Sequence, residues 1–356
     1  MLKKKKRKAN LEVTIKDIAK ELKISIAAAS KALNDLPGVS DPLRLKVKKT
    51  AETMGYKKYL RSSLINAYER NLKFIVVLYG RIGGHLMEQL EAGIDDNIRK
   101  RGYYELRYLI DVSKELNSEE KKELFLDTIL REKGVVGVLA CYLKISDVLI
   151  AKLYKNKIPV ALLENYTDFG RCITIDNVKA SYRTVGKLIE LGHRKIGCIM
   201  AQEDIDHVWA DRLEGYKKAL KDKEIGYDPT LIVYENSVGI NEAGLATKEL
   251  LEKDPQITAI LYGSDRQAYG GMSALRELGK RIPEDIAIIG FDDIELNKIL
   301  TPSLSSVRQP IKELGELGIN MLFESIEKND FSHKSVVLDT ELMLRGSCLK
   351  DYKEYK

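Results

Sequence analysis

The chain has 356 residues, too many for one ordinary core, so we expect two or three domains. Hydrophobic residues make up 44% and charged residues 31%, which excludes a disordered chain, and no apolar run approaches the roughly 18 residues that span a membrane. The net charge is +6, yet residues 1–70 hold 18 Lys and Arg against 7 Asp and Glu, so the remainder is slightly acidic and the N-terminal part is suited to a polyanion such as nucleic acid.

The cysteines and histidines indicate no metal or cofactor site. The four cysteines are far apart, with no CxxC pair, and no histidine is placed to complete a zinc cluster. The basic N-terminus also lacks the apolar segment of a secretory signal. We therefore expect reduced, mostly buried thiols in a cytoplasmic protein; these cysteines are Cys141, Cys172, Cys198 and Cys348.

The N-terminal region begins with a lysine-rich tail and continues as three short helices. Residues 3–8 are almost all Lys, which is equally consistent with a solvated tail and with an auxiliary phosphate contact. Thr14 and Asp17 resemble a capping box for a first helix, and Ser25 can cap a second helix that runs to about Leu33. A third helix opens at Asp41. Three helices in about 45 residues predict a small bundle.

Beyond about residue 72, short β-type runs alternate with amphipathic helices. This alternation predicts right-handed parallel crossovers in layered α/β sheets, and eight strands fit two lobes better than one. The predicted strands are Phe74–Tyr79, Tyr104–Ile110, Val135–Cys141, Ile158–Leu163, Lys195–Met200, Leu231–Tyr234, Ile257–Tyr262 and Ile286–Gly290.

The first two helices and their tight turn have the spacing of a helix-turn-helix, whose second helix enters the major groove of DNA by its N-terminal end. On that helix, spacing places Ala29 and Leu33 on a packing side. The other side is predicted to meet DNA: apolar contacts with thymine methyls, a polar or phosphate contact and a guanine or phosphate contact. These residues are Ile26, Ala27, Ser30 and Lys31.

The head also resembles a known family. VTIKDIAKELKIS (Val13–Ser25), KALND (Lys31–Asp35), PGVSDPLRLKV (Pro37–Val47) and MGY (Met54–Tyr56) are similar, almost position by position, to the head of LacI-family transcription regulators. The resemblance implies phosphate contacts from Thr14, Ser25, Ser30, Asn34 and Tyr56. It also implies that a hinge-helix leucine, here Leu64, wedges into the minor groove.

Two departures from the family pattern concern the turn and the hinge. Lys23 stands where relatives usually have Gly, so a left-handed backbone there would cost about 1 kcal/mol. The usual hinge elements are replaced by Lys58-Tyr59 and, with one residue apparently missing, by Arg61–Leu64.

The resemblance continues through the body, for example in RLEGYKKAL (Arg212–Leu220) and RELGKRIPEDIAIIGFDDIEL (Arg276–Leu296). It implies the two-lobed α/β fold of periplasmic binding proteins, with a small-molecule effector held between the lobes. Ligands of open parallel sheets bind at the carboxyl ends of the strands, where Asp265 and Asp292 lie. With Arg212, these are the predicted effector contacts. For Asp265 a helix N-cap remains an alternative, and for Arg212 an ion pair.

Three further positions could contribute to the effector site. His85 and Leu86 occupy the place where relatives usually carry an aromatic pair, so the usual stacking contact is in doubt. Trp209, the only tryptophan, could supply a replacement platform or belong to the core.

The sequence therefore predicts a sequence-specific DNA-binding regulator, usually a repressor in this family, and not an enzyme. It is expected to act as a homodimer on a pseudo-palindromic operator, and the effector is a sugar or related metabolite. The alternatives are a solute-binding protein and a regulator controlled by a partner protein. The expected parts are a basic tail (1–12), a helix-turn-helix domain (13–57), a hinge (58–72), a two-lobed effector and dimerisation domain (73–347) and a C-terminal tail (348–356).

Overall fold

The computed structural model describes residues 13–33, 36–54, 72–80, 84–110, 121, 124–125, 127–129, 132, 134–201, 207–235 and 239–352. By internal contacts the chain divides into two compact units, Met1–Leu72 and Lys73–Lys356, called here the head and the body.

The described part of the head contains three helices around a small apolar core: α1 (Ile15–Glu21), α2 (Ile26–Leu33) and α3 (Asp41–Thr53). One face of each helix is buried, as the apolar spacing predicts. The core consists of Ile18, Ala32, Leu33, Val47 and Ala51, with Leu43 and Met54 packed against it. The predicted three-helix bundle is confirmed.

Local signals fix where α1 and α2 begin. The Asp17 carboxylate accepts hydrogen bonds from the backbone N–H of Thr14 at 2.8 Å and from its hydroxyl at 2.6 Å. Ser25 Oγ accepts from the N–H of Ala28 at 3.1 Å. Between the two helices, Lys23 has φ 52°, the left-handed conformation that glycine adopts most easily.

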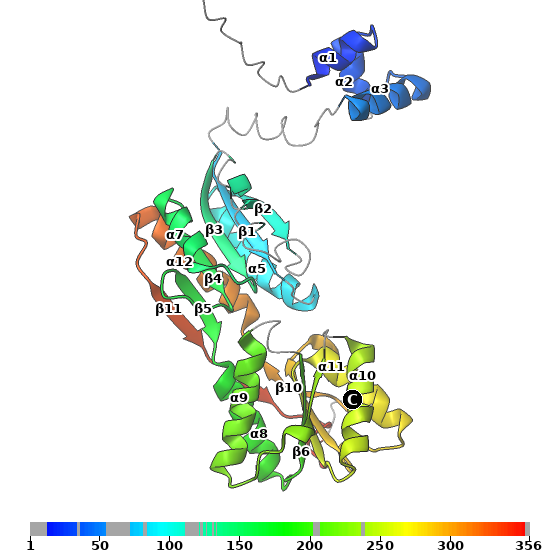
Figure 1. The fold of residues 1–356 in the computed structure, drawn as a ribbon, viewed down its shortest axis with the longest axis vertical. Coiled ribbons are helices and arrows are strands. Elements are labelled where there is room, and N and C mark those ends of the chain that lie inside the picture. The colour runs from blue at the N-terminus through cyan, green and yellow to red at the C-terminus, as the bar shows by residue number, and fades with distance from the viewer. Residues whose placement is uncertain are drawn as a thin grey trace, which may run out of the picture. The chain divides into compact units, whose positions relative to one another are not determined.

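The first lobe of the body contains a six-stranded sheet in the order β11-β5-β4-β3-β1-β2, with every pair parallel. Helices α5 and α12 pack together, with α12 against the sheet, and α7 packs against β4 (Figure 1). The strands are β1 (Phe74–Tyr79), β2 (Tyr104–Leu109), β3 (Val135–Cys141), β4 (Val160–Leu163), β5 (Arg171–Ile175) and β11 (Lys334–Leu338), and the helices are α5 (Gly84–Lys100), α7 (Asp147–Lys155) and α12 (Ile311–Lys328).

The second lobe contains another six-stranded sheet, in the order β12-β10-β9-β8-β6-β7, parallel except for the antiparallel β12. Helices α8 and α9 pack together, as do α10 and α11. The elements are β6 (Ile196–Ala201), β7 (Ile232–Glu235), β8 (Ala259–Tyr262), β9 (Ala287–Asp292), β10 (Ser305–Arg308), β12 (Glu341–Met343), α8 (Asn177–Glu190), α9 (His207–Asp222), α10 (Ile240–Lys253), α11 (Asp265–Glu277) and the 3₁₀ helices η1 (Pro229–Leu231) and η2 (Glu295–Lys298).

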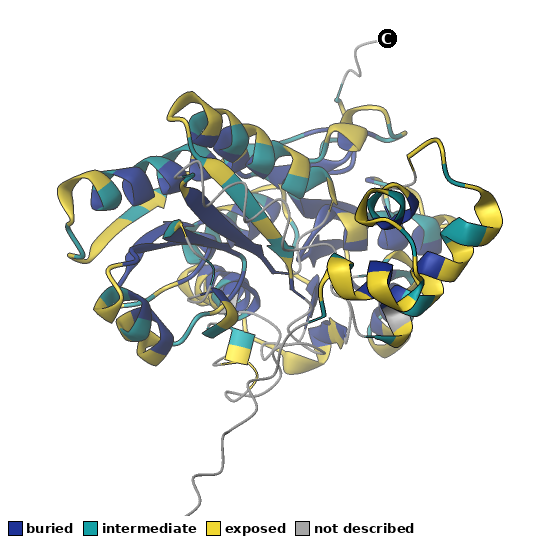
Figure 2. Cartoon of the chain, turned by 90° about the horizontal axis from the view of Figure 1, so that it is seen from above, coloured by how far each residue is buried: buried dark blue, intermediate teal, exposed yellow. Residues whose placement is uncertain are grey.

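The chain crosses between the two sheets three times: from β5 to α8, from β10 to α12 and from β11 to β12. Each lobe is therefore assembled from segments that are far apart in the sequence. In Figure 2 the central strands are buried along their length, while the helices present one exposed side.

All eight strands predicted from the sequence are present, with ends shifted by up to two residues. Four others were not predicted: β5, β10, β11 and β12.

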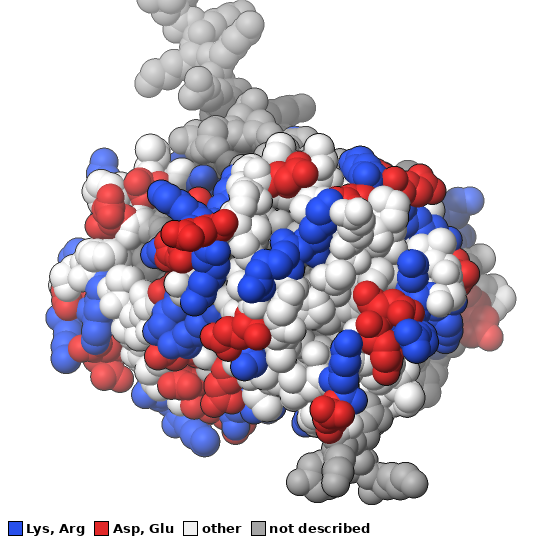
Figure 3. Space-filling model, turned by 90° about the horizontal axis from the view of Figure 1, so that it is seen from below, with Lys and Arg blue, Asp and Glu red and all other residues white. Residues whose placement is uncertain are grey.

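In the described part of the chain no helix is both long enough and apolar enough to cross a membrane. On the face drawn in Figure 3, basic and acidic side chains are interspersed.

Candidate nucleic-acid interface and ligand site

Helix α2 has one buried side and one exposed side. Ala29 and Leu33 are buried, whereas Ile26 keeps 48% of its surface exposed and Ala27 and Lys31 are also exposed. Ile26 therefore keeps about half of its surface outside the packing of the head. The predicted packing side of α2 is buried, and three of the four residues predicted to meet DNA are exposed.

The N-terminal end of α2 is suited to a phosphate or a groove. Ser25 and Thr14 are exposed at the starts of α2 and α1, where helix N–H groups and the helix dipole favour negative charge. Ser30 is half-buried on α2. Three further predicted contacts, Asn34, Tyr56 and Leu64, lie outside the described residues.

In the body, non-glycine residues with left-handed backbone gather at the carboxyl ends of strands. Tyr142 follows β3 with φ 51°, Glu164 follows β4 with φ 52°, and Asp292 ends β9 with φ 122° before Asp293 with φ 54°. Each such conformation costs about 1–3 kcal/mol and persists only where surrounding contacts hold it. Such residues are typical of binding sites.

Arg212 is the predicted contact with the most extensive set of partners. It is 5% exposed, its Nε donates to Asn177 Oδ1 at 2.9 Å, and its Nη1 donates to the Gly263 carbonyl at 2.6 Å. The guanidinium carbon lies 3.6 Å from the centre of the Phe291 ring. The side chain is buried, so an ion pair at the surface is wrong for Arg212, whereas an ion pair between the lobes stays an alternative to effector binding.

Asp292 lies at the same strand edge and is half-buried. Gln309 Nε2 donates to its Oδ1 at 2.6 Å. Burial raises the pKa of the Asp292 carboxyl to about 6, and the positive charge of Arg212 opposes this rise. Asp292 and Arg212 thus interact electrostatically at the ends of neighbouring elements, as a shared ligand site requires.

Glu164 and Asn177, which were not predicted, join this pair across the lobes. Glu164 lies after β4 in the first lobe, and its Oε1 accepts from the N–H of Ile175 at 2.7 Å. Its Oε2 accepts from Asn177 Nδ2 at 3.3 Å, and Asn177 in turn accepts from Arg212. The strand-end rule that selected Asp292 also applies to Glu164, which directly follows the buried strand β4.

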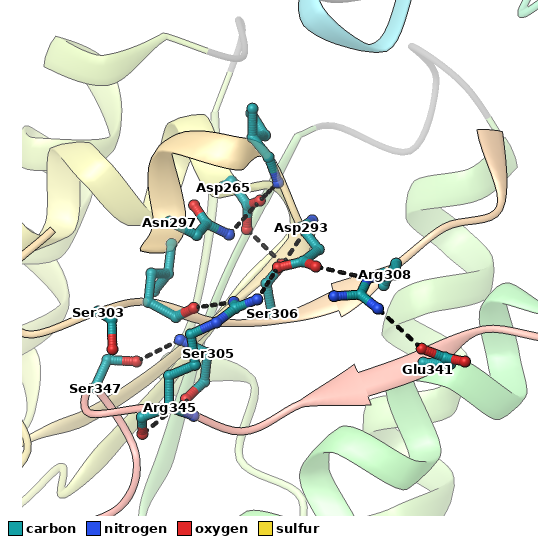
Figure 4. A network of polar contacts seen from close by, with 12 residues as sticks. Asp265, Asp293, Asn297, Ser303, Ser305, Ser306, Arg308, Glu341, Arg345 and Ser347 are labelled. Atoms are coloured by element: carbon teal, nitrogen blue, oxygen red, sulfur yellow. Dashed lines mark hydrogen bonds and ion pairs between the residues drawn. The ribbon is translucent and has the colours of Figure 1, made fainter. Parts of the chain in front are cut away.

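Asp265 lies beneath the site, fully buried at the start of α11. Its Oδ1 accepts from the Ser306 hydroxyl at 2.6 Å, and its Oδ2 accepts from the Ile294 N–H and from Asn297 Nδ2, both at 2.8 Å (Figure 4). Burial holds the pKa of Asp265 well above its ordinary value. The N-cap interpretation is wrong, because Ser264 occupies the cap and accepts from the N–H of Gln267.

The other predicted effector residues lie in different surroundings. Trp209 is 8% exposed in the second-lobe core, with the Arg212 guanidinium 5.2 Å from its ring centre. His85 and Leu86 belong to the first turn of α5, where Gln89 contacts the His85 ring at 2.9 Å and Leu86 packs against the first-lobe core. The described contacts do not bring His85 or Leu86 to Arg212.

Metal-ligating side chains do not gather in the parts of the chain that the structure describes: no group of three His, Cys, Asp or Glu there could hold a metal ion. The four cysteines are buried and unpaired by disulfides.

Two known families match this chain, one over the head and one over part of the body. Residues 14–58 match the bacterial regulatory proteins of the lacI family, and residues 185–348 match a periplasmic binding protein-like domain.

Individual relatives match over nearly the full length. The ribose operon repressor of Halalkalibacterium halodurans is 30% identical over 334 residues, covering 93% of this chain and 96% of that protein. The HTH-type transcriptional repressor CytR of Escherichia coli is 29% identical, covering 96% and 98%. A LacI-family regulator from Enterococcus faecium, solved with bound ribose, is 27% identical with a TM-score of 0.68, covering 78% and 98%.

The helical head, the two-lobed body and these matches define a DNA-binding transcription regulator. More specifically, the chain belongs to the LacI family of bacterial regulatory proteins.

Proposed function

We propose that the chain is a repressor that binds a pseudo-palindromic operator as a homodimer and whose affinity for that operator is set by a small molecule bound between the lobes. The exposed first turn of α2 carries the proposal, because Ile26 keeps 48% of its surface exposed there and this apolar surface is available to a partner. A regulator of chromosomal DNA in a bacterium works in the cytoplasm, and this mechanism requires no chemical turnover.

In the proposed complex the leading turn of α2 lies in the major groove. Ile26 and Ala27 contact thymine methyls, and Lys31 contacts guanine or phosphate. Thr14, Ser25, Ser30, Asn34 and Tyr56 contact phosphates and fix the orientation of the head. Leu64 enters the minor groove between the two half-sites.

The effector is proposed to contact Arg212 and Asp292, with Trp209 beside them and His85 and Leu86 contributing from the first lobe. A ligand that touches both lobes favours one arrangement of the lobes by its differential contacts. The Glu164–Asn177–Arg212 chain supports this, because it already links a first-lobe carboxylate to a second-lobe guanidinium. Ribose bound by the Enterococcus faecium relative supports a sugar or related metabolite as the effector.

Lys31→Ala tests the assignment of α2. We expect operator affinity to fall about 10-fold to 100-fold, or discrimination against altered operators to weaken, because a base or phosphate contact is lost. Effector affinity should be unchanged. Binding is measured by fluorescence anisotropy with an operator selected from random duplexes, at several salt concentrations.

Lys20→Ala is the matched control, since it removes an exposed lysine from α1 instead. Wild-type operator affinity and sequence preference in the Lys31→Ala protein would contradict the assignment. Absence of any duplex preference in the wild type, with or without candidate effectors, would contradict the proposed function itself.

A further inference from the structure

A second carboxyl group lies at the strand edge that carries Asp292. Glu235 ends β7 and pairs in register with Ala201, the last residue of β6. It is only 4% exposed, and its Oε2 accepts from Gln267 Nε2 at 3.0 Å. Its Oε1 is buried and has no hydrogen-bond partner among the described residues. A buried charged oxygen without a donor is costly, which points to a donor that a ligand supplies.

Short contacts connect Glu235 to Arg212. Gln267, which holds the Glu235 carboxyl, lies in the first turn of α11, and a Cβ on Gly263 would lie 3.0 Å from Gln267 Oε1 and 2.6 Å from Trp209 Cζ3. The Gly263 carbonyl accepts from Arg212. Only glycine fits this close approach. Because Gly263 contacts both Arg212 and Gln267, Gln267 and the Glu235 carboxyl that it holds lie next to the Arg212 end of the site.

Among the charged groups named at these strand ends, carboxyl groups outnumber guanidinium groups. Glu164, Asp292 and Glu235 contribute three carboxyl groups, whereas Arg212 contributes one guanidinium that already donates to Asn177 and Gly263. Gln309 Oε1 is another buried acceptor with no partner in the described part of the chain. A ligand that brings hydrogen-bond donors and positive charge would compensate both imbalances, whereas an anionic ligand would increase them.

We propose that Glu235, held by Gln267, is an acidic subsite of the effector site and binds a protonated amino group of the effector. This inference rests on the proposed function, and it narrows the ligand to an amino-bearing polyol or sugar. An ammonium group can donate to Glu235 Oε1 and neutralise its charge. A hydroxyl group can donate but leaves the charge uncompensated.

The pH dependence of binding follows from the surroundings of Glu235. Burial raises the pKa of the Glu235 carboxyl to about 7; the Gln267 amide of α11 opposes this rise, and Glu242 of α10 adds to it. The charge of Glu235 also acts on the hydroxyl group of Tyr262 in β8 and raises its pKa. An ammonium group binds the ionised carboxylate, so amine affinity is expected to rise as the pH passes through about 7 while the amine stays protonated.

The test compares ligand pairs that differ in one amino group: glucamine with sorbitol, glucosamine with glucose, and galactosamine with galactose. Isothermal titration calorimetry with the full chain is expected to show at least one amine bound about tenfold or more tighter than its hydroxyl counterpart. Glu235→Gln should abolish that preference and the rise of amine affinity with pH. Glu235→Asp, which keeps the charge, should retain part of the preference. Glu242→Gln, an exposed neighbour on α10, is the matched control and should keep the preference for the amine, with the rise of amine affinity moved to lower pH because Glu242 raises the pKa of Glu235.

Equal binding of both members of every pair, a preference that survives Glu235→Gln, or no binding of any amine at millimolar concentration would overturn the subsite. Operator binding is measured with the same preparations. Protein that binds its operator but shows no amine preference contradicts only this inference, whereas protein that binds no operator contradicts the proposed function.

Discussion

Four side chains at the strand ends of the body are attached to strained backbone. Tyr142, Glu164, Asp292 and Asp293 all have positive φ and all follow or end parallel strands. The Tyr142 hydroxyl is buried without a partner in the described structure, and the charges of Glu164, Asp292 and Arg212 act on it. Sequence position at a strand end identified Asp292, but no sequence pattern announces a left-handed tyrosine or glutamate. The strand-end rule also applies to Glu164, but the left-handed backbone of these residues is visible only in their dihedral angles.

Asp292 also predicts a specific pH dependence of stability. Its pKa is about 6 in the folded chain and 3.8 as a free carboxyl, so the folded state holds the proton more tightly. Stability due to this group is present below about pH 4 and is lost as the pH rises to about 6. In Asp292→Asn this loss should be absent. The difference in unfolding free energy, wild type minus variant, should therefore fall by at most about 3 kcal/mol across that interval.

Urea unfolding of both proteins at a series of pH values measures this difference, with the carboxyl groups that the Asp292 charge does not influence cancelling between them. A difference that stays constant from pH 4 to pH 7 would show that Asp292 is not held in a desolvated environment. The Asp292→Asn protein should also bind its operator normally while its response to effector is lost.

The segment from β9 to η2 owes its shape to a polar network beneath it. Asp265 holds Ser306, Ile294 and Asn297, while the Asp293 carboxylate lies 2.8 Å from Arg308 Nε and 2.7 Å from Arg345 Nη2 (Figure 4). Arg345 follows β12 near the end of the chain, and Arg308 ends β10 next to a lobe crossing. The position of Asp292 thus depends on residues up to 53 positions away, which local sequence patterns do not reveal.

This network predicts different consequences for two neighbouring aspartates. Asp265→Ala leaves one hydroxyl and two N–H donors buried without an acceptor, so we expect a loss of about 3–5 kcal/mol in unfolding free energy. Asp292→Ala should cost about 1 kcal/mol or less, because that side chain is half-buried at the site. Urea denaturation measures both changes at neutral pH. Equal losses for the two variants would refute a supporting role for Asp265.

Which strands were predictable follows from their composition. The central strands among the eight predicted carry runs of apolar residues, because parallel strands covered on both faces bury every side chain, whereas the edge strand β2 has only exposed and half-buried residues. β10 reads Ser-Ser-Val-Arg and β5 begins with the buried Arg171, whose Nη1 and Nη2 contact Glu324 at 2.9 Å and Asp330 at 2.7 Å. Their polar residues find partners only in the folded lobe. β11 and β12 lie at sheet edges and are mostly exposed or half-buried, so their apolar signal is weak.

For the complete chain, the sequence predicted the division into a basic helical head and a two-lobed α/β body, because both follow from charge distribution and periodicity. It did not predict the Glu164–Asn177–Arg212 chain or the Glu235–Gln267 pair. Those contacts join residues between 13 and 35 positions apart, and they depend on how strand ends and helix starts converge. The contacts of the hinge with DNA stay a prediction.

The reactivity of the four cysteine thiols measures the unfolding of each lobe separately. Cys141 and Cys172 are buried in the first lobe, and Cys198 and Cys348 in the second. Burial raises the pKa of all four, that of Cys348 to about 12, so thiolate is scarce at neutral pH. Iodoacetamide should therefore label the native chain at least about 100-fold more slowly than the urea-unfolded chain.

Mass spectrometry of tryptic peptides resolves the labelling of each cysteine during a urea titration. The two thiols of one lobe are expected to become reactive together. Rapid labelling of any of the four in native buffer would contradict the burial of that thiol.

The three crossings between the lobes constrain how the chain can fold during synthesis. Helix α12 and strand β11 complete the first sheet and come from residues 311–338, while β12 and Arg345 complete the second sheet only a few residues later. A ribosome must therefore release the chain to about residue 340 before either half of the body can close its core. Premature termination near residue 330 would remove β11 and β12, so neither sheet of the body would be complete. The head could still fold around its own small core, but its DNA binding would no longer respond to a metabolite.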